Sequence, residues 1–189
     1  MAIDFSQVKT ITIPEGSVTK ITDSTGNTLW QGVGWHTIWE GNKTCSITKS
    51  GNDTPVISGA DENFAQTVAG TGYTPKIRIT FSYSNTNTDP SWTTGYYLNG
   101  LPNANPLSSP LIIELVSNMF NNIRMCAIAC KYTDADKKAH TVDVGLWKKR
   151  DTNNNRLIFQ LNGKSSTDIN SYSGNFTLTF TITKIEQYY

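Results

Sequence analysis

The sequence is poor in the residues that usually carry charge, metal binding and acid–base chemistry. Of its 189 residues only 16% are charged and two are histidines, against a charged share of about 25% in ordinary globular proteins. Sixteen Lys and Arg against 15 Asp and Glu leave a formal net charge of +1, which disfavours binding to nucleic acid by phosphate neutralisation. No apolar run reaches the roughly 18 residues that a membrane-spanning helix needs, so we expect no membrane insertion.

Three cysteines are too few to suggest a disulfide framework. Cys126 and Cys130 lie in a run typical of a strand, so their Cα atoms are expected to be roughly 13 Å apart, beyond the about 7 Å that a disulfide allows. Whether Cys45 pairs with either depends on which strands are neighbours, and the sequence leaves this open. No apolar leader follows Met1, and we expect buried, reduced thiols in a protein made in a reducing cytosol.

Small neutral polar residues are abundant instead. The chain holds 26 Thr, 16 Ser and 18 Asn, types that suit strands and turns better than helices. Residues 77–83 and 176–183 alternate apolar with polar side chains, as half-buried antiparallel strands do, whereas residues 125–132 are apolar on both faces and should lie centrally in a sheet. We predict an all-β protein built as an antiparallel β-sandwich, jelly-roll-like or immunoglobulin-like.

Four segments are less regular. Residues 61–68 are the best candidate for a short helix, although the segment is short and lacks a clear cap. Residues 111–116 form either a buried strand or the start of a short helix. Residues 84–110 are predicted to be rich in loops, because prolines, glycines and asparagines recur in them. Residues 133–139 are expected to form a hairpin loop.

The first part of the chain is predicted to be a unit of its own. Three short β-type runs separated by turn residues form a small three-strand N-terminal module: residues 8–13, 18–23 and 28–30. We place this attachment module at residues 1–31, a short glycine linker at 32–34 and the sandwich domain at 35–189. The module is too small to bury its apolar side chains, so it is expected to dock on another protein, or on the sandwich in cis, through Ile11, Ile13, Val18, Ile21, Leu29 and Trp30.

The search for catalytic chemistry is negative. No nucleophile elbow, phosphate-binding loop, zinc-protease motif or paired C-x-x-C occurs. His36 lies between two tryptophans and is expected to have a structural role, and His140 is expected to be solvated. Asp134 and Asp136 resemble the start of a calcium loop, but the later ligands are missing. We therefore expect a non-enzymatic protein with no catalytic residues, cofactor or metal.

One stretch has the composition of a sugar-binding surface. Trp92, Tyr96, Tyr97 and Asn99 would offer a sugar aromatic faces for stacking and an amide for its hydroxyls. The alternative, favoured slightly, is that these aromatics fill the end of the sandwich or a seam between subunits while the asparagines form turns.

The N-terminal segment resembles a known class of proteins. Residues 11–30 follow the pattern I-x-I-P-x-G-x-V-x-x-I-x-D-x-x-G-x-x-L-W and are followed by Gly34-Trp35-His36-Thr37-Ile38-Trp39-Glu40-Gly41. This is similar to the opening of structural proteins of tailed bacteriophages and of prophages in gut bacteria, where such a module precedes a β-rich domain. About 40 residues carry the resemblance, and the remainder shares only the β-rich, Thr- and Asn-rich texture.

The resemblance implies a virion protein made in the host bacterial cytoplasm. The module would anchor the chain to other virion proteins, either portal and tail proteins or capsid proteins. The sandwich would project as a tail-fibre or receptor-binding tip that contacts a host-surface glycan, or as a head decoration. A homo-oligomer, a trimer in the first instance, is expected by symmetry. The alternatives are a soluble, lectin-like carbohydrate-binding module and, more weakly, an enzyme that acts on polysaccharide.

Overall fold

The structure is a computed structural model that describes residues 20–22, 24–25, 28–115 and 123–189. Its elements are β1 (Lys20–Thr22), β2 (Thr28–Gln31), β3 (Trp35–Lys49), β4 (Val56–Ser58), β5 (Asp61–Gln66), β6 (Lys76–Asn85), β7 (Trp92–Leu98), β8 (Leu101–Asn103), β9 (Leu111–Glu114), β10 (Ile123–Thr133), β11 (Ala139–Asp151), β12 (Arg156–Ser165), the 3₁₀ helix η1 (Ile169–Ser171) and β13 (Phe176–Tyr188). The described residues contain no helix long and apolar enough to cross a membrane.

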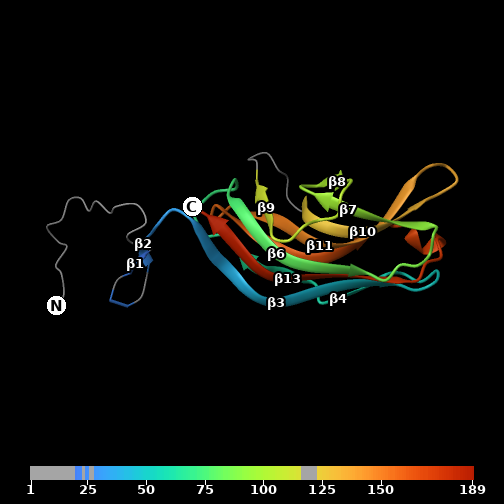
Figure 1. Ribbon diagram of the computed structural model, residues 1–189, viewed down its shortest axis with the longest axis horizontal. Helices are drawn as coiled ribbons and strands as arrows, with labels where there is room; N and C mark the ends of the chain where they lie inside the picture. Colours follow the sequence, from blue (N-terminus) through green and yellow to red (C-terminus); the bar gives the residue numbers. More distant parts are fainter. Residues whose placement is uncertain (1–19, 23, 26–27, 116–122) are drawn as a thin grey trace.

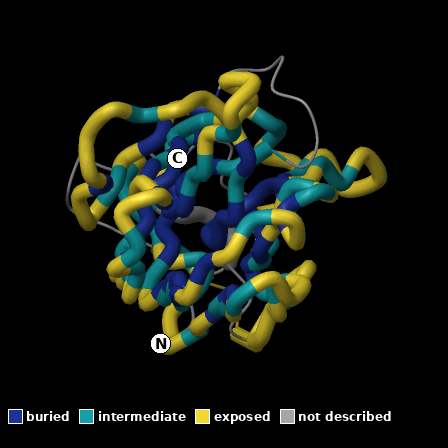
Figure 2. The backbone as a smooth tube through the Cα atoms, turned by 90° about the vertical axis from the view of Figure 1, so that its right-hand side faces the viewer, coloured by how far each residue is buried: buried dark blue, intermediate teal, exposed yellow. Residues whose placement is uncertain are grey.

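Strands β3 to β13 form two antiparallel sheets that pack face to face (Figure 1). The six-stranded sheet has the order β5-β12-β11-β10-β7-β8, and the five-stranded sheet has the order β4-β3-β13-β6-β9. Figure 2 shows the buried stretches of backbone gathered toward the middle of the molecule and the exposed loops around them. The prediction of an all-β antiparallel sandwich is confirmed.

The alternating runs lie where their periodicity predicts. β13 pairs with β3 on one side and with β6 on the other. Phe180 and Ile182 on β13 are fully buried between the sheets, and burial of each such side chain contributes about 1.5–3 kcal/mol. Thr181 faces outward from the same strand, and its hydroxyl lies 2.8 Å from that of Thr44 on β3. The sequence alternation therefore sets which face of the sheet meets the core.

β10 occupies an interior position, between β11 and β7, as its two apolar faces predicted. Its residues Cys126, Ile128 and Cys130 belong to the core between the sheets. Ala127 and Ala129 point to the outer face of the six-stranded sheet, where they form a second, small buried cluster with Tyr97 and Trp147. The outer face of this sheet is thus partly covered by its own side chains.

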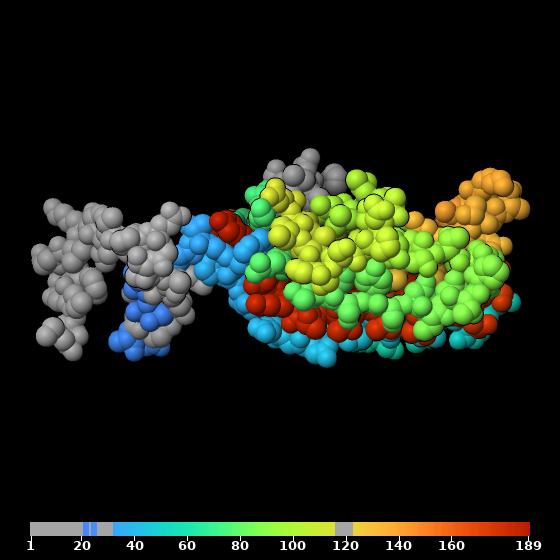
Figure 3. All heavy atoms as spheres, in the orientation of Figure 1, coloured from blue at the N-terminus to red at the C-terminus, as the bar shows by residue number. Residues whose placement is uncertain are grey.

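The N-terminal strands lie outside the sandwich. β1 and β2 pair antiparallel in a two-stranded sheet of their own, and Figure 1 shows this pair beyond the end of the sandwich where the C-terminus lies. The strand expected over residues 8–13 falls outside the described residues. The sandwich begins at Gly34, whose N–H donates to Tyr189 O at 2.7 Å while the Tyr189 N–H donates to Gly34 O at 3.1 Å. In Figure 3 the C-terminal atoms lie against those of the first sandwich residues.

Two local expectations are corrected. Residues 61–66 form strand β5 rather than a helix, because the segment lies along β12 and pairs with it while Ala65 enters the core and Phe64 packs on Trp39 at 5.1 Å between ring centroids. Residues 84–110 are less loop-like than predicted, since they contain β7 and β8. Residues 111–114 form strand β9, and 116–122, where the helical alternative would have continued, lie outside the described residues.

Candidate functional site

Only part of the predicted attachment set is described. Ile11, Ile13 and Val18 lie outside the described residues. Ile21 is on β1, directly opposite Trp30 of β2 in the antiparallel register. Leu29 is also on β2. The attachment role of these six residues remains a prediction.

The predicted sugar-contacting residues do not share one surface. Trp92 is 3% exposed; its Nε1–H donates to Ser173 O at 2.8 Å, and its ring lies edge-on to Phe176. Tyr96 packs against the core from the same face of β7 and contacts the ring of Tyr83. Tyr97 points to the opposite face of the sheet. A single stacking platform made of these three aromatics is therefore not formed, and Trp92 fills the end of the sandwich.

Asn99 lies in the turn between β7 and β8. Its backbone adopts a φ of 50°, and its N–H donates to Met125 O at 3.0 Å. The side-chain Oδ1 is buried and has no hydrogen-bond partner within the described part of the chain. Asn99 is thus apart from the inward-facing Trp92 and Tyr96. In the structure it is a turn residue.

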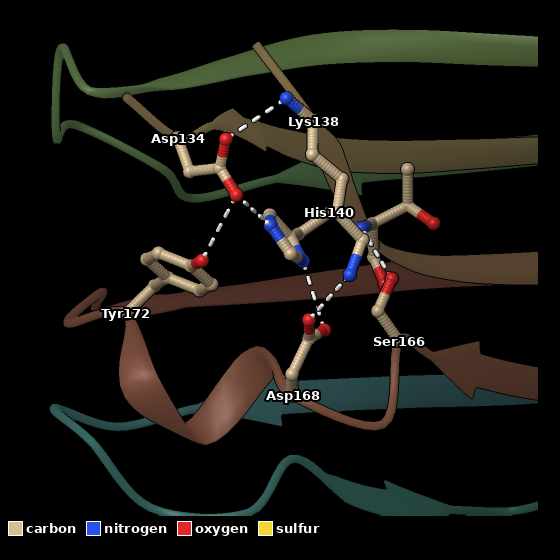
Figure 4. A network of polar contacts seen from close by, with 7 residues as sticks. Asp134, Lys138, His140, Ser166, Asp168 and Tyr172 are labelled. Atoms are coloured by element: carbon tan, nitrogen blue, oxygen red, sulfur yellow. Dashed lines mark hydrogen bonds and ion pairs between the residues drawn. The ribbon is translucent and has the colours of Figure 1, made fainter. Parts of the chain in front are cut away.

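His140 is the centre of a polar network that the sequence reasoning missed. The side chain, at the start of β11, is 1% exposed rather than solvated. Its Nε2–H donates to Asp134 Oδ2 at 2.8 Å and its Nδ1–H to Asp168 Oδ1 at 2.8 Å. The Tyr172 ring lies against the imidazole at 4.4 Å between centroids, tilted by 38°, and its hydroxyl donates to Asp134 at 3.3 Å. Figure 4 shows the imidazole held between the two carboxylates.

The electrostatics of this network favour a charged imidazole. Two carboxylates accept from the two ring nitrogens, so both nitrogens carry a proton. The hydrogen bond to Asp134, followed by the one to Asp168, raises the pKa of His140 above its ordinary value, although burial acts in the opposite direction. The pKa of Asp134 is lowered chiefly by His140, and that of Asp168 chiefly by Lys138, whose Nζ lies 2.9 Å away. The ring is fully engaged and cannot serve as a general base in this arrangement.

The same geometry does not build a metal centre. Asp134 and Asp168 lie at opposite nitrogens of the ring, so the three side chains do not converge on one point. Across the described residues, no group of three or more His, Cys, Asp or Glu side chains is placed to hold a metal ion. The trio instead joins three segments: the β10–β11 hairpin, the start of β11 and the entry to η1.

The sequence held a weak signal for this network. Asp134 and His140 flank the predicted hairpin loop, so they were bound to be near in space, but Asp168 comes 28 residues later. Only the pairing of β11 with β12 brings Asp168 beside the hairpin. The other histidine, His36, behaves as expected: its Nε2–H donates to Gly32 O at 2.6 Å and its ring stacks on Tyr189.

The network belongs to a well-connected end of the sandwich, which we call the distal end, opposite the β1–β2 pair. The loops after β3, β6, β10 and β12 meet there (Figure 1). Lys49, 1% exposed, donates through Nζ to Gly51 O at 2.6 Å and Asp53 O at 3.1 Å. The Asn170 amide reaches the Thr54 hydroxyl at 2.9 Å. The distal loops are therefore fixed to one another by hydrogen bonds.

A second charged cluster lies on the outer face of the six-stranded sheet. Arg124 of β10 makes a two-pronged ion pair with Asp143 of β11, with Nε–Oδ1 at 2.9 Å and the second guanidinium nitrogen to Oδ2 at 2.7 Å. The Asp143 side chain is 0% exposed. Burial raises the pKa of Asp143, and the hydrogen bonds from Arg124 oppose that rise. The guanidinium also stacks over Tyr97 at 4.5 Å from the ring centroid, which fixes it in place.

The three cysteines are buried and free, as expected. Cys45 lies on β3, in the sheet opposite to the one that holds Cys126 and Cys130. Burial raises the pKa of Cys45 to about 11 and that of Cys130 to about 12, and also raises that of Cys126. A neutral thiol is a poor nucleophile and a poor metal ligand, so these side chains act as core residues.

Comparison of the chain with protein-family models, with curated proteins and with solved structures finds no match in any of the three. The interpretation of these sites therefore rests on their geometry alone.

Proposed function

We propose that the chain is a non-enzymatic structural protein of a bacteriophage virion, anchored through residues 1–31 and projecting the β-sandwich from the particle. The projecting end would be a tail-fibre or receptor-binding tip, or a head decoration. Its partners would be other virion proteins, with further copies of the chain, three in the first instance, around a symmetry axis.

The observation that carries the proposal is the position of the N-terminal module relative to the two ends of the sandwich. The sandwich begins and ends at one pole, where Gly34 and Tyr189 exchange two backbone hydrogen bonds. The β1–β2 pair lies beyond that same pole (Figure 1). A chain held by its N-terminal module would therefore present the distal end, with its interlocked loops, away from the attachment point. A rigid, outward-facing loop cluster suits a contact surface, since loops fixed on a sandwich commonly carry binding.

The state of the histidines supports the non-enzymatic part of the proposal. His140 uses both ring nitrogens on carboxylates, and the Nε2–H of His36 is engaged by a backbone carbonyl. The three thiols are buried with raised pKa values. Imidazoles and thiols most often act as bases or nucleophiles. Here the imidazoles are held in hydrogen bonds and the thiols are buried in the core.

The decisive experiment is immunogold electron microscopy of purified particles with antibody raised to residues 35–189. Gold at the tail tip would support a receptor-binding part, and gold on the head a decoration protein. Unlabelled particles beside abundant free protein would overturn the proposal in favour of a soluble sugar-binding module.

The anchor is tested by Trp30→Ala, with Val33→Ala as the control. Val33 is 81% exposed and lies outside the attachment module. Trp30→Ala should abolish incorporation into particles while the thermal unfolding of the sandwich is unchanged, and Val33→Ala should be incorporated normally. Particles that carry Trp30→Ala at normal copy number would contradict the anchoring role.

A further inference from the structure

The outer face of the six-stranded sheet carries a hollow that neither the fold nor the proposed attachment explains. It is open to solvent, with a volume of about 230 Å³, and it is lined by Glu62, Trp147, Lys149, Gln160, Asn162 and Lys164. This is smaller than the clefts of roughly 300–1,000 Å³ that accept drug-sized ligands. The hollow is therefore of a size for one ring and its substituents rather than for a long segment of chain.

Three neighbouring strands supply the lining in a fixed register. β11 contributes Trp147 and Lys149, β12 contributes Gln160, Asn162 and Lys164, and β5 contributes Glu62. Trp147 lies directly opposite Gln160, and Asn162 lies opposite Gly145, which has no side chain. A Cβ at Gly145 would meet Cys126 O at 2.2 Å, so the close approach of β10 and β11 requires glycine there.

Trp147 adds an observation of its own. The side chain is 1% exposed, yet its Nε1–H is buried with no hydrogen-bond partner among the described residues. Buried polar groups in folded proteins nearly always have a partner. The indole is held by its neighbours, with Arg124 6.0 Å and Lys164 5.8 Å from the ring centroid. A side chain that lines the hollow thus has a donor without an acceptor.

We propose that this hollow binds one acidic sugar unit of a surface polysaccharide, a ring that carries hydroxyls and a carboxylate. The two amides, Gln160 and Asn162, can each donate to and accept from hydroxyls. Lys149 and Lys164 outnumber Glu62 in the lining, and within the described residues neither lysine forms a salt bridge. Lys164 lies opposite Asp143 in the register, and its positive charge opposes the rise that burial causes in the pKa of that carboxyl. The lysines receive the carboxylate, and the sugar ring lies beside Trp147, which lines the hollow.

The proposal differs in place from the sugar surface expected from the sequence. The expected residues were Trp92, Tyr96, Tyr97 and Asn99, and the hollow uses none of them. It also goes beyond the virion proposal and does not depend on it, because a sugar site on the sandwich would serve a projecting tip or a soluble module equally.

The test is calorimetric titration of the full chain with a galacturonic acid trimer and, in parallel, with the uncharged galactose trimer at the same ionic strength. We expect the acidic trimer to bind at least tenfold more tightly. Lys149→Glu, an exposed change that reverses the balance of charge in the hollow, should weaken the acidic trimer at least tenfold and leave the neutral one unaffected. Gln160→Ala should weaken both, and Gln66→Ala, an exposed amide of β5 outside the hollow, should weaken neither.

A spectroscopic readout places the ligand. In ¹⁵N-labelled protein, the Trp147 indole N–H resonance, identified by its loss in Trp147→Phe, should shift on addition of the acidic trimer. Absence of binding by both trimers at millimolar concentration would overturn the site, and equal binding of the two would overturn its acidic specificity. Binding that survives Lys149→Glu unchanged would place the ligand elsewhere. Immunogold labelling tests the virion role separately, so failure of one proposal is distinguishable from failure of the other.

Discussion

At the scale of single residues, the sandwich keeps most of its buried charge in pairs. Asp143 faces Arg124, Glu186 faces Arg78 at 2.6 Å, and His140 lies between two carboxylates. Burying an unpaired charge is costly because water no longer solvates it. Burial, with a smaller contribution from Arg150, lowers the pKa of Lys148 to about 8. The pairs therefore make stability depend on pH in ways that single substitutions can test.

His140→Gln should remove a pH-dependent part of the stability. The pKa of folded His140 is raised, so the folded state holds a proton that the unfolded state releases above pH about 6.5. Its stabilisation is complete below that pH and is lost as the pH rises through the folded value. The pKa values of Asp134 and Asp168 are lowered, so their share is present above pH about 4 and is lost at lower pH. Melting temperatures measured from pH 5 to 9 should show His140→Gln several degrees below wild type near pH 6, with the gap closing toward pH 9.

Asp136→Asn controls for a change of charge in the same loop, since Asp136 makes no hydrogen bond or ion pair with the His140 network. It should show no comparable closing of the gap. A difference between wild type and His140→Gln that stays constant across the whole range would contradict a charged, carboxylate-held imidazole.

Arg124→Met should strongly destabilise the protein by leaving Asp143 buried without its partner. Removing one member of a buried pair typically costs about 3–5 kcal/mol. The Asp143 side chain is 0% exposed and its pKa is already raised by burial, so the cost should be largest near pH 8 and should fall toward pH 5, where the carboxyl can take up a proton. Urea unfolding at the two pH values measures this. The matched control is Lys76→Met, which breaks the exposed Lys76–Glu114 pair and should cost about 0–1 kcal/mol.

At the scale of elements, alternation was a sound guide wherever one face of a strand meets the core and the other meets water. β6 and β13 both follow their expected faces. β10 was placed correctly in the sheet interior because both its faces are apolar, and the structure gives the reason: Tyr97 and Trp147 cover its outer alanines. The spacing of apolar residues and their expected burial therefore predicted most of the sandwich.

Edge strands and long-range pairs were beyond that guide. β5 has no clean alternation, and its strand form comes from pairing with β12, some 90 residues away in sequence. The loop-rich interpretation of residues 84–110 missed β7 because its glycine and threonines dilute the apolar pattern, although Trp92, Tyr96 and Leu98 share the core face. The hollow combines side chains of β5, β11 and β12. No local sequence motif predicts that these side chains lie together.

Gly145→Ala tests the contact between β10 and β11. The added Cβ would lie 2.2 Å from Cys126 O and 2.5 Å from the Ala127 Cα, both backbone atoms that cannot move without separating the strands. Overpacking of this kind costs about 1–3 kcal/mol. Gly163→Ala, on the neighbouring β12, is the control, because its Cβ would come no closer than 3.3 Å to any neighbour. Chemical denaturation should show the larger loss for Gly145→Ala, and equal losses for both would contradict a strand contact limited by backbone.

At the scale of the whole molecule, the proposed attachment module and the distal loops lie at opposite ends (Figure 1). The two strands of the N-terminal module lie beyond the pole where the sandwich begins and ends, and the interlocked loops lie at the other (Figure 1). The described core contains no residue that precedes Cys45. Partly buried side chains of early β3, such as Ile38 and Trp39, pack against that core from within the sandwich. Among the described residues, the core is therefore formed by the sandwich itself.

A chain shortened to residues 32–189 should therefore fold with the melting temperature of the full protein. Starting at residue 32 keeps both Gly34–Tyr189 hydrogen bonds and the contact of His36 with Gly32. The end of the sandwich next to the module therefore keeps these contacts. Calorimetry of the two proteins, with dye binding as a probe of exposed apolar surface, makes the comparison. The alternative left open by the sequence is that the apolar residues of the module pack on the sandwich in cis. In that case the shortened chain would melt several degrees lower and bind the dye, because removing the module would uncover the surface it had protected. An unchanged melting temperature together with loss of incorporation into particles would assign the module to attachment alone.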